Sequence, residues 1–393
     1  MTRPGKIRVC IVAPSLDIFG GQSRQAVRLL TGMQKEASLD ISFLPHNPQL
    51  PFPLRWMQRI KFVRTVVTSL VYWMMLAVRF PRYDIVHVFS ASYYSYLLSV
   101  APAILIGKMY GKRVILNYRS GEAEDHLEKW KLTAVPIMRL ADAIVVPSDY
   151  LVTVFARFGL NARAIFNLVE IDRFRFRDRA PLRPVFLCSR LLEPLYNVGN
   201  VLRAFQIIQQ QYLDARLTIA ADGWMRAGLE QLARDLQLRD VSFIGRVSFD
   251  KMPDLYDAHD IYLTATDIDN MPASITESMA CGLLVVTTNA GGIPWILTHD
   301  ETGLMVECGD YKALADNAMR LLHDPILASR LARNARESVG RFTWEAVRDE
   351  WLKVYCALMN GGLPSVSSDN LTRDCFNGYT KPFVNAQSRE KRT

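Results

Sequence analysis

The most informative stretch of this chain is Asp269-Asn270-Met271-Pro272-Ala273-Ser274-Ile275-Thr276-Glu277, continued by Ser278-Met279-Ala280-Cys281-Gly282. The apolar runs at 260–264 and 283–286 lie on either side of it and are typical of buried strands. The segment between them therefore predicts a loop and one short helix. Pro272 suits the first helical turn because its φ is already helical, and Gly282 suits a left-handed cap at the far end.

The start of this helix is a candidate anion site. Its unpaired N–H groups are expected on or near Met271, Ala273 and Ser274. A phosphate at the helix start, a sugar near Asp269 and a ribose near Glu277 would use every polar group of the segment. The alternative is an ordinary capped helix, with Asp269 or Asn270 as the cap and Glu277 in solvent.

Glycine-containing turns follow several predicted strands. Gly291-Gly292 stand in Asn289-Ala290-Gly291-Gly292-Ile293-Pro294, and Gly223 follows the strand at 217–220. Gly20-Gly21 open a helix at 22–33 after the strand at 7–13, where a plain tight turn is the alternative. Glycine lets a backbone approach a ligand such as a phosphate closely, so we expect a ligand at these turns.

These motifs resemble the retaining nucleotide-sugar glycosyltransferases of family 4, whose signature is an acid, seven residues and a Glu, followed by a Gly-Gly turn. The resemblance extends from about residue 7 to about residue 360. It implies an α/β protein of the GT-B fold, two Rossmann-like doubly wound domains facing across a cleft. The implied parts are an acceptor-binding domain at 1–175, a donor-binding domain at 176–342, a closing helix at 343–360 that crosses back to the first domain, and a mobile polar tail at 361–393.

The resemblance also implies roles for single residues. Arg190, after the strand at 185–188, would meet the diphosphate, but the lysine usual about five residues later is absent from this sequence. Arg119 stands where the family usually has a His, and an arginine stabilises charge but carries no proton at neutral pH. Asp269 replaces the usual Glu. Arg246 belongs to the segment that borders the nucleotide base.

Histidines and metals receive smaller roles. His87 lies in an apolar strand and is expected to be a core residue, while His126 is a candidate substitute proton carrier. Asp267 and Asp269 have the spacing of a metal-binding Asp-x-Asp motif, but the resemblance accounts for Asp269 without a metal. We therefore expect no metal and no cofactor besides the nucleotide-sugar substrate.

The composition fits this interpretation. A chain of 393 residues that is half apolar can bury two ordinary cores. Its six cysteines form no C-x-x-C pair and indicate a reduced, cytosolic protein, and no secretory signal precedes the first strand. The net charge is +8, yet no recognition motif supports nucleic-acid binding.

The stretch at 55–80 is apolar and aromatic, with basic residues at both ends and no acid between Asp40 and Asp84. It is too interrupted for a spanning helix. It predicts a helix in the interface of an anionic membrane, or a crossover helix packed on the sheet, and one helix could do both. The bases expected at lipid are Arg55, Arg59, Lys61 and Arg64.

The sequence thus predicts a retaining glycosyltransferase that uses a nucleoside-diphosphate sugar and a lipid-linked or cell-surface polysaccharide precursor. We expect it in the cytoplasm, peripheral on the inner face of the plasma membrane. The expected catalytic residues are Asp269, Glu277, Arg190 and Arg119. One rival is a non-catalytic sugar-nucleotide-binding subunit of a membrane polysaccharide complex. Another is an epimerase, for which Glu122 and His126 are the candidate acids and bases.

Overall fold

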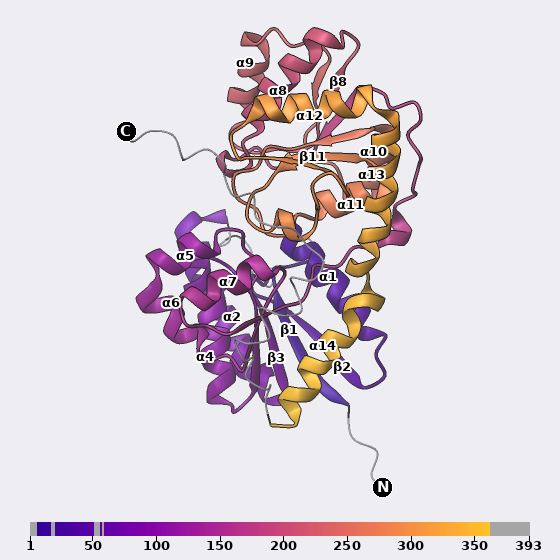
Figure 1. Ribbon diagram of the computed structural model, residues 1–393. Helices are drawn as coiled ribbons and strands as arrows, with labels where there is room; N and C mark the ends of the chain where they lie inside the picture. Colours follow the sequence, from indigo (N-terminus) through magenta and orange to yellow (C-terminus); the bar gives the residue numbers. More distant parts are fainter. Residues whose placement is uncertain (1–5, 17–19, 51–55, 57–58, 362–393) are drawn as a thin grey trace, which may run out of the picture. The chain divides into compact units, whose positions relative to one another are not determined.

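Two parallel six-stranded sheets organise the chain in the computed structural model, which describes residues 6–16, 20–50, 56 and 59–361 (Figure 1). The first sheet has the order β2-β1-β3-β4-β5-β6 and the second β12-β11-β10-β7-β8-β9. The strands of the first are β1 Ile7–Ala13, β2 Leu39–Pro45, β3 Ile85–Phe89, β4 Arg113–Asn117, β5 Ala143–Val146 and β6 Ala162–Ala164. Those of the second are β7 Val185–Cys188, β8 Arg216–Ile219, β9 Val241–Phe243, β10 Ile261–Leu263, β11 Leu284–Thr288 and β12 Leu304–Val306.

Helices connect the strands and cover both faces of each sheet. In the first half these are α1 Gly21–Gln34, α2 Lys61–Arg79, α3 Tyr93–Ser95, a π-helical turn Tyr96–Val100, α4 Ala101–Met109, α5 Ala123–Lys129, α6 Lys131–Met138 and α7 Asp149–Arg157. In the second half they are α8 Val198–Gln211, α9 Arg226–Asp235, α10 Met252–Ala258, α11 Ala273–Cys281, α12 Tyr311–His323, α13 Pro325–Ser338 and α14 Trp344–Met359.

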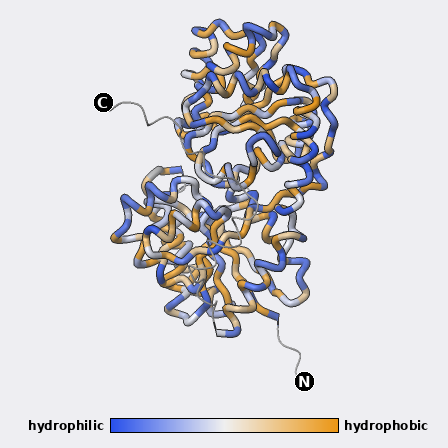
Figure 2. Tube along the Cα trace, viewed as in Figure 1, coloured by the Kyte–Doolittle hydropathy of each residue, from blue (hydrophilic) through white to orange (hydrophobic). Residues whose placement is uncertain are grey.

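Strand alternation supplies the buried surfaces. Successive side chains of a strand point to opposite faces, so Cys10 and Val12 of β1 join the core beneath α2 and α4, while Val9 and Ile11 join the core beneath α1 and α14. Because both faces are covered, the strands are almost continuously apolar. Figure 2 shows them as hydrophobic tubes inside a more polar exterior.

The last helix, α14, packs on the first sheet as expected for the closing helix. Val347, Trp351 and Tyr355 are buried in the core that α1 and the first sheet share. The Tyr355 hydroxyl also lies 2.8 Å from Nδ1 of His87 in β3. Of the tail expected at 361–393, all but Gly361 lies outside the described residues.

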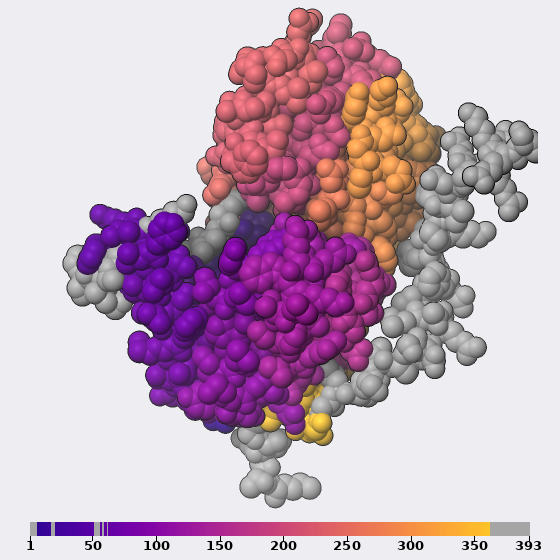
Figure 3. Space-filling model, turned by 90° about the vertical axis from the view of Figure 1, so that its left-hand side faces the viewer, coloured from indigo at the N-terminus to yellow at the C-terminus, as the bar shows by residue number. Residues whose placement is uncertain are grey.

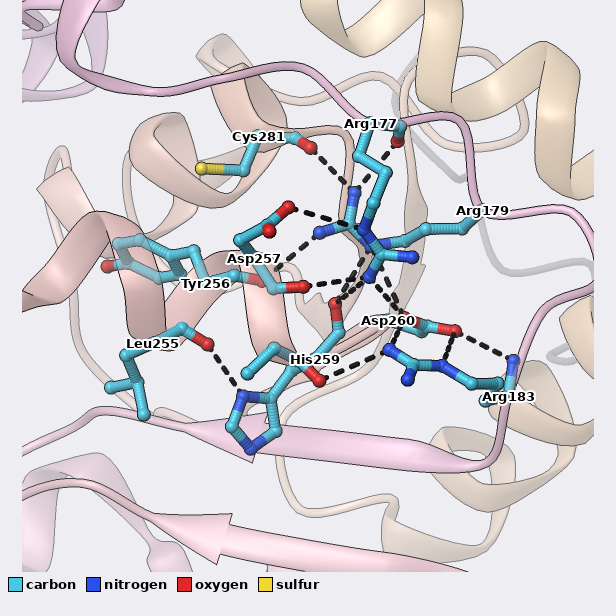
Figure 4. Close-up of polar contacts among 10 residues, drawn as sticks. Arg177, Arg179, Arg183, Leu255, Tyr256, Asp257, His259, Asp260 and Cys281 are labelled. Atoms are coloured by element: carbon cyan, nitrogen blue, oxygen red, sulfur yellow. Dashed lines mark hydrogen bonds and ion pairs between the residues drawn. The ribbon is translucent and has the colours of Figure 1, made fainter.

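Between β6 and β7 the chain is fixed to the second sheet by an ion cluster around Asp260. Figure 4 shows Arg177, Arg179 and Arg183 converging on this carboxylate at the start of β10. Asp260 is fully buried and accepts hydrogen bonds from Arg177 Nη2 at 2.8 Å and Arg183 Nη2 at 2.7 Å. The charged segment 173–184 is therefore anchored at the end of the sheet opposite the carboxyl ends of the strands.

The sequence at 92–110 predicts one helix, and the chain is helical from 93 to 109, with the π-helical turn between α3 and α4. Pro102 in the first turn of α4 has no N–H to offer the carbonyl of Leu98. That carbonyl accepts a hydrogen bond from the Trp73 indole of α2, at 3.0 Å. The last strand of the first sheet, β6, ends at Ala164, and residues 165–168 belong to no strand.

Helix α2 is docked on one side and open on the other. Tyr72 and Leu76 are buried in the first core, and Tyr72 Oη donates to the carbonyl of Ser99 at 2.9 Å. An apolar stripe faces outward at intervals of four residues, each side chain more than half exposed: Phe62, Val66, Leu70, Met74 and Val78. Figure 3 shows the indigo-to-violet segment that contains α2 at the surface. By length and composition, Phe62–Arg82 is the one helix among the described residues that could cross a membrane.

Candidate active site

A cavity of about 370 Å³ lies where loops from both sheets meet, at the carboxyl ends of the strands. Most of the residues expected at the site line it: Gly20, Gly21, Arg119, Arg190, Arg246, Asp269, Asn270, Met271, Ala273, Ser274 and Glu277. The structure therefore brings together residues that are up to about 250 positions apart in the sequence. Their roles remain predictions.

Helix α11 places Glu277 inside the cavity wall. The helix spans Ala273–Cys281, so Pro272 is its N-cap, with an extended backbone, and lies outside the first turn in which the sequence predicts it. Gly282 has the left-handed φ of 79° expected for the cap at the far end. Glu277 is 1% exposed rather than solvated. Its Oε1 accepts from Arg28 Nη2 of α1 at 2.8 Å, and its Oε2 accepts from Tyr256 Oη at 3.0 Å.

Arg190 and Asp269 form a partly buried ion pair near the start of the same helix. Arg190 Nη1 also donates to Ser274 Oγ at 3.2 Å. Burial raises the pKa of the Asp269 carboxyl, and the guanidinium beside it opposes that rise. Tyr196 occupies the region in which the lysine is missing, and its ring centroid lies 4.3 Å from the Arg190 guanidinium.

Arg119 enters the cavity from the loop after β4. Its Nε donates to Asn117 Oδ1 at 2.8 Å. His126 is buried against Tyr118 and is absent from the cavity lining. Burial lowers the pKa of His126 to about 4. The candidate proton carrier is therefore a core residue, because it sits in an aromatic cluster instead of facing the cavity.

The three other glycines of the predicted site, Gly223, Gly291 and Gly292, are not among the residues that line the cavity, and their contact with a ligand stays a prediction. A Cβ on Gly291 would lie 2.0 Å from the carbonyl oxygen of Asp269, and one on Gly292 would lie 2.1 Å from that of Asn270. A Cβ on Gly223 would lie 2.4 Å from the carbonyl oxygen of Leu192. These glycines allow backbone to pack on backbone directly behind the cavity wall.

The basic residues expected at lipid are only partly described. Arg55 lies outside the described residues, as does the side chain of Lys61. Arg59 and Arg64 are exposed at the N-terminal end of α2 and do not line the cavity.

Sequence reasoning missed several lining residues, among them Arg24, Tyr196 and Tyr256. Arg24 Nη1 lies 3.6 Å from Glu277 Oε1. The available signal was the pair Arg24 and Arg28, one turn apart on the helix that Gly20-Gly21 open. Nothing local indicates that this face of α1 meets α11.

The two acids of the Asp-x-Asp spacing have different partners. Asp267 accepts from Asn197 Nδ2 at 3.1 Å, whereas Asp269 pairs with Arg190. Within the described part of the chain, no three His, Cys, Asp or Glu side chains are grouped as a metal site requires.

Comparisons with known proteins agree with this geometry. Residues 171–338 match the family model described as glycosyl transferases group 1. N-acetyl-alpha-D-glucosaminyl L-malate synthase of Bacillus anthracis is 28% identical over 204 residues, covering 49% of this chain and 53% of that protein. The lipopolysaccharide core biosynthesis glycosyltransferase LpsE of Rhizobium meliloti is 33% identical over 194 residues, covering 48% and 54%. The chain thus aligns with about half the length of these relatives.

The fold matches a solved structure over more of the chain than the sequence matches these relatives. The Anabaena HepE structure, solved with UDP-glucose, has a TM-score of 0.66 at 15% identity and covers 88% of this chain and 98% of its own. Two parallel sheets with loops meeting at one cavity, and a last helix returning to the first sheet, define the GT-B architecture. Residues 171–338, from just before β7 to the end of α13, are the part of the chain that matches the glycosyl transferases group 1 model.

Proposed function

We propose that this protein is a retaining glycosyltransferase that moves a sugar from a nucleoside diphosphate to a lipid-linked or cell-surface polysaccharide precursor. The observation that carries the proposal is the meeting of Arg190, Asp269 and Glu277 around the first turn of α11 in one cavity. The UDP-glucose bound by HepE supports a nucleotide-sugar donor. The name of LpsE supports an acceptor of the cell envelope.

In the proposed reaction, the bond between the anomeric carbon and the phosphate oxygen breaks, and its electron pair stays on the diphosphate. The acceptor hydroxyl bonds to that carbon on the same face, and its proton passes to the departing phosphate oxygen. Arg190 and the N–H groups of the first turn of α11 would stabilise the growing negative charge. Glu277 would accept hydrogen bonds from the ribose, and Asp269 from the sugar.

The test is a thermal-shift screen with UDP, GDP, ADP and their sugars, followed by a transfer assay with the donor that binds. We expect stabilisation by one nucleotide series and transfer that persists in EDTA. Dependence on Mg²⁺ would overturn the metal-free mechanism. Binding without donor hydrolysis or transfer, over a broad acceptor panel, would instead identify a non-catalytic sugar-nucleotide-binding subunit.

We further propose that α2 lies on an anionic membrane surface on the cytoplasmic side. The exposed stripe from Phe62 to Val78 offers apolar side chains to the lipid. Exposed Arg59 and Arg64 lie at one end of the helix, and Arg79 ends it. Since the opposite face is already packed in the first core, we favour a helix in the interface over one that spans the membrane.

Liposome flotation tests this partner. A variant with Leu70→Ser and Met74→Ser should float less with anionic vesicles than the wild type, and Arg59→Ser with Arg64→Ser should lose part of the anionic preference. Ile326→Ser, which removes an exposed apolar side chain in α13, is the matched control and should float like the wild type. Equal recovery of all four proteins would refute the membrane proposal.

A further inference from the structure

Arg119 is a partly buried arginine at the cavity, and no acid among the described residues forms an ion pair with it. Arg190 and Arg24 line the same cavity and face Asp269 and Glu277. Arg119, by contrast, makes no ion pair within the described part of the chain, and its Nη1 atom is buried without a hydrogen-bond partner. A buried charge is costly unless it is paired. The arrangement therefore favours a ligand that brings an anion to this guanidinium.

A buried network holds Arg119 in place. Its Nε donates to Asn117 Oδ1, and Asn117 Nδ2 lies 2.9 Å from His87 Nε2. Burial lowers the pKa of His87 to about 3, so the ring is neutral and its Nε2 accepts from the amide, while Nδ1 meets Tyr355. This series of hydrogen bonds orients the amide oxygen of Asn117 toward Arg119. The Phe89 ring, 5.4 Å from the guanidinium carbon, supports the cation from β3.

The position of the loop indicates which part of a substrate Arg119 would meet. A Cβ on Gly121 would lie 3.6 Å from Ile268 Cγ2 and 3.7 Å from Asp269 Cα. The loop that carries Arg119 thus packs on the loop that carries Asp269. In the proposed function Asp269 reads sugar hydroxyls, which places Arg119 near the transferred sugar and its acceptor.

We propose that Arg119 binds an acidic group of a substrate at the sugar end of the cavity, as a specificity-determining residue. The group is a carboxylate or phosphate oxyanion. It is carried either by the transferred sugar, as in a nucleoside-diphosphate uronic acid, or by the acceptor beside its reacting hydroxyl. The inference rests on the proposed function, because it needs a donor in this cavity.

The donor arm of the test compares a neutral and an acidic sugar on one nucleotide, for example UDP-glucose and UDP-glucuronate, by titration calorimetry, with UDP alone as the reference. If the sugar carries the acid, the wild type should bind the acidic donor more tightly. Arg119→Gln should then weaken that complex by roughly 10- to 100-fold, as expected for lost hydrogen bonds to a charged group. Binding of UDP and of the neutral donor should change less than twofold.

The acceptor arm measures malate and glycerol 3-phosphate against glycerol, each with the protein saturated in UDP. An Arg119-dependent preference for the acids in this arm alone would assign the oxyanion to the acceptor. A uniform loss for UDP and both donors would mean that Arg119 serves the diphosphate and would overturn the inference. No effect in either arm would overturn it too. If the wild type binds no nucleotide, the proposed function itself fails.

Two further variants control for folding. Arg113→Gln removes an arginine at the opposite end of the same strand, where it pairs with Asp142 at 3.2 Å, and should leave all titrations unchanged. Arg119→Lys keeps a cation and should retain part of the acidic preference even if Arg119→Gln folds poorly. If Arg119→Lys and Arg119→Gln lose the same affinity for neutral and acidic ligands, the role of Arg119 is structural.

Discussion

Among single residues, Glu277 has surroundings that bear most directly on donor binding. Both of its oxygens already accept hydrogen bonds, from Arg28 and Tyr256. A carboxylate has about four acceptor positions, so ribose hydroxyls can still donate to it. The pair with Arg28 keeps the carboxylate oriented toward the cavity.

The substitution Glu277→Gln should therefore keep the shape of the side chain but remove its negative charge. We expect kcat/KM for the donor to fall roughly 10- to 100-fold, since a hydrogen bond to a charged group contributes about 1.5–3 kcal/mol. The melting temperature should also fall, because Arg28 loses a buried counter-ion. Glu230→Gln changes a half-exposed acid that pairs with Arg226 and serves as the control. Wild-type turnover by folded Glu277→Gln would show that this site assignment is wrong.

Short contiguous patterns made some residues predictable. The cap at Gly282 followed from a glycine at the end of an apolar helix, and it has the expected left-handed conformation. The contact between Arg28 and Glu277 joins positions 249 apart, and no local pattern encodes it. No local pattern encodes the contact between the Tyr196 ring and the Arg190 guanidinium either. In that region the sequence indicated only that the lysine usual in the family is missing.

Among the elements, β1 and β7 lie at the predicted bounds, 7–13 and 185–188. Both are apolar runs, interrupted only at Arg8 of β1, and such runs are the strongest signal a sequence carries for a buried strand. The predicted helix at 92–110 is present but has a π-helical turn in its middle, where the Trp73 indole of another helix donates to the Leu98 carbonyl because Pro102 has no N–H to offer it. Tertiary contacts of this kind override local propensity.

The turn of Gly291 and Gly292 supports the loop that carries Asp269. Gly292→Ala would force a Cβ against the carbonyl of Asn270, so we expect the loop to shift. Activity should drop at least tenfold and stability by about 1–3 kcal/mol, as for other overpacked sites. Gly228→Ala in α9 meets open space and should be neutral or slightly stabilising. Equal activity of the two variants would contradict the supporting role of the turn.

The linker between the halves depends on the Asp260 cluster. Asp260→Asn leaves Arg179, whose side chain is 1% exposed, without its buried carboxylate. We expect a loss of about 3–5 kcal/mol in the free energy of unfolding, measured by urea denaturation. Asp257→Asn is the matched control, since Asp257 is half-exposed and, among the described residues, forms its ion pair with Arg177. Similar stabilities of the two variants would show that the cluster contributes little.

For the whole molecule, buried titratable groups predict how stability depends on pH. Burial lowers the pKa of His87 to about 3 and that of His126 to about 4, from an ordinary 6.5. Burial alone would raise the pKa of Asp260, but hydrogen bonds from Arg183 and Arg177 bring it below 3.8. A group whose pKa is lower in the folded state stabilises the fold above its unfolded pKa, and this contribution is lost as pH falls toward the folded value.

The two kinds of group act in different pH windows. The unfolded chain protonates its histidines below about pH 6.5, so each buried histidine should reduce stability by up to about 1.4 kcal/mol per pH unit from there toward pH 4. Below pH 3.8, protonation of Asp260 lowers the stability further. Urea titrations between pH 7 and 4 should show a shallower slope for His87→Asn than for the wild type. His323→Asn, at an exposed position, should keep the wild-type slope. If His87→Asn also keeps the wild-type slope, His87 is not the neutral buried ring that orients Asn117 toward Arg119.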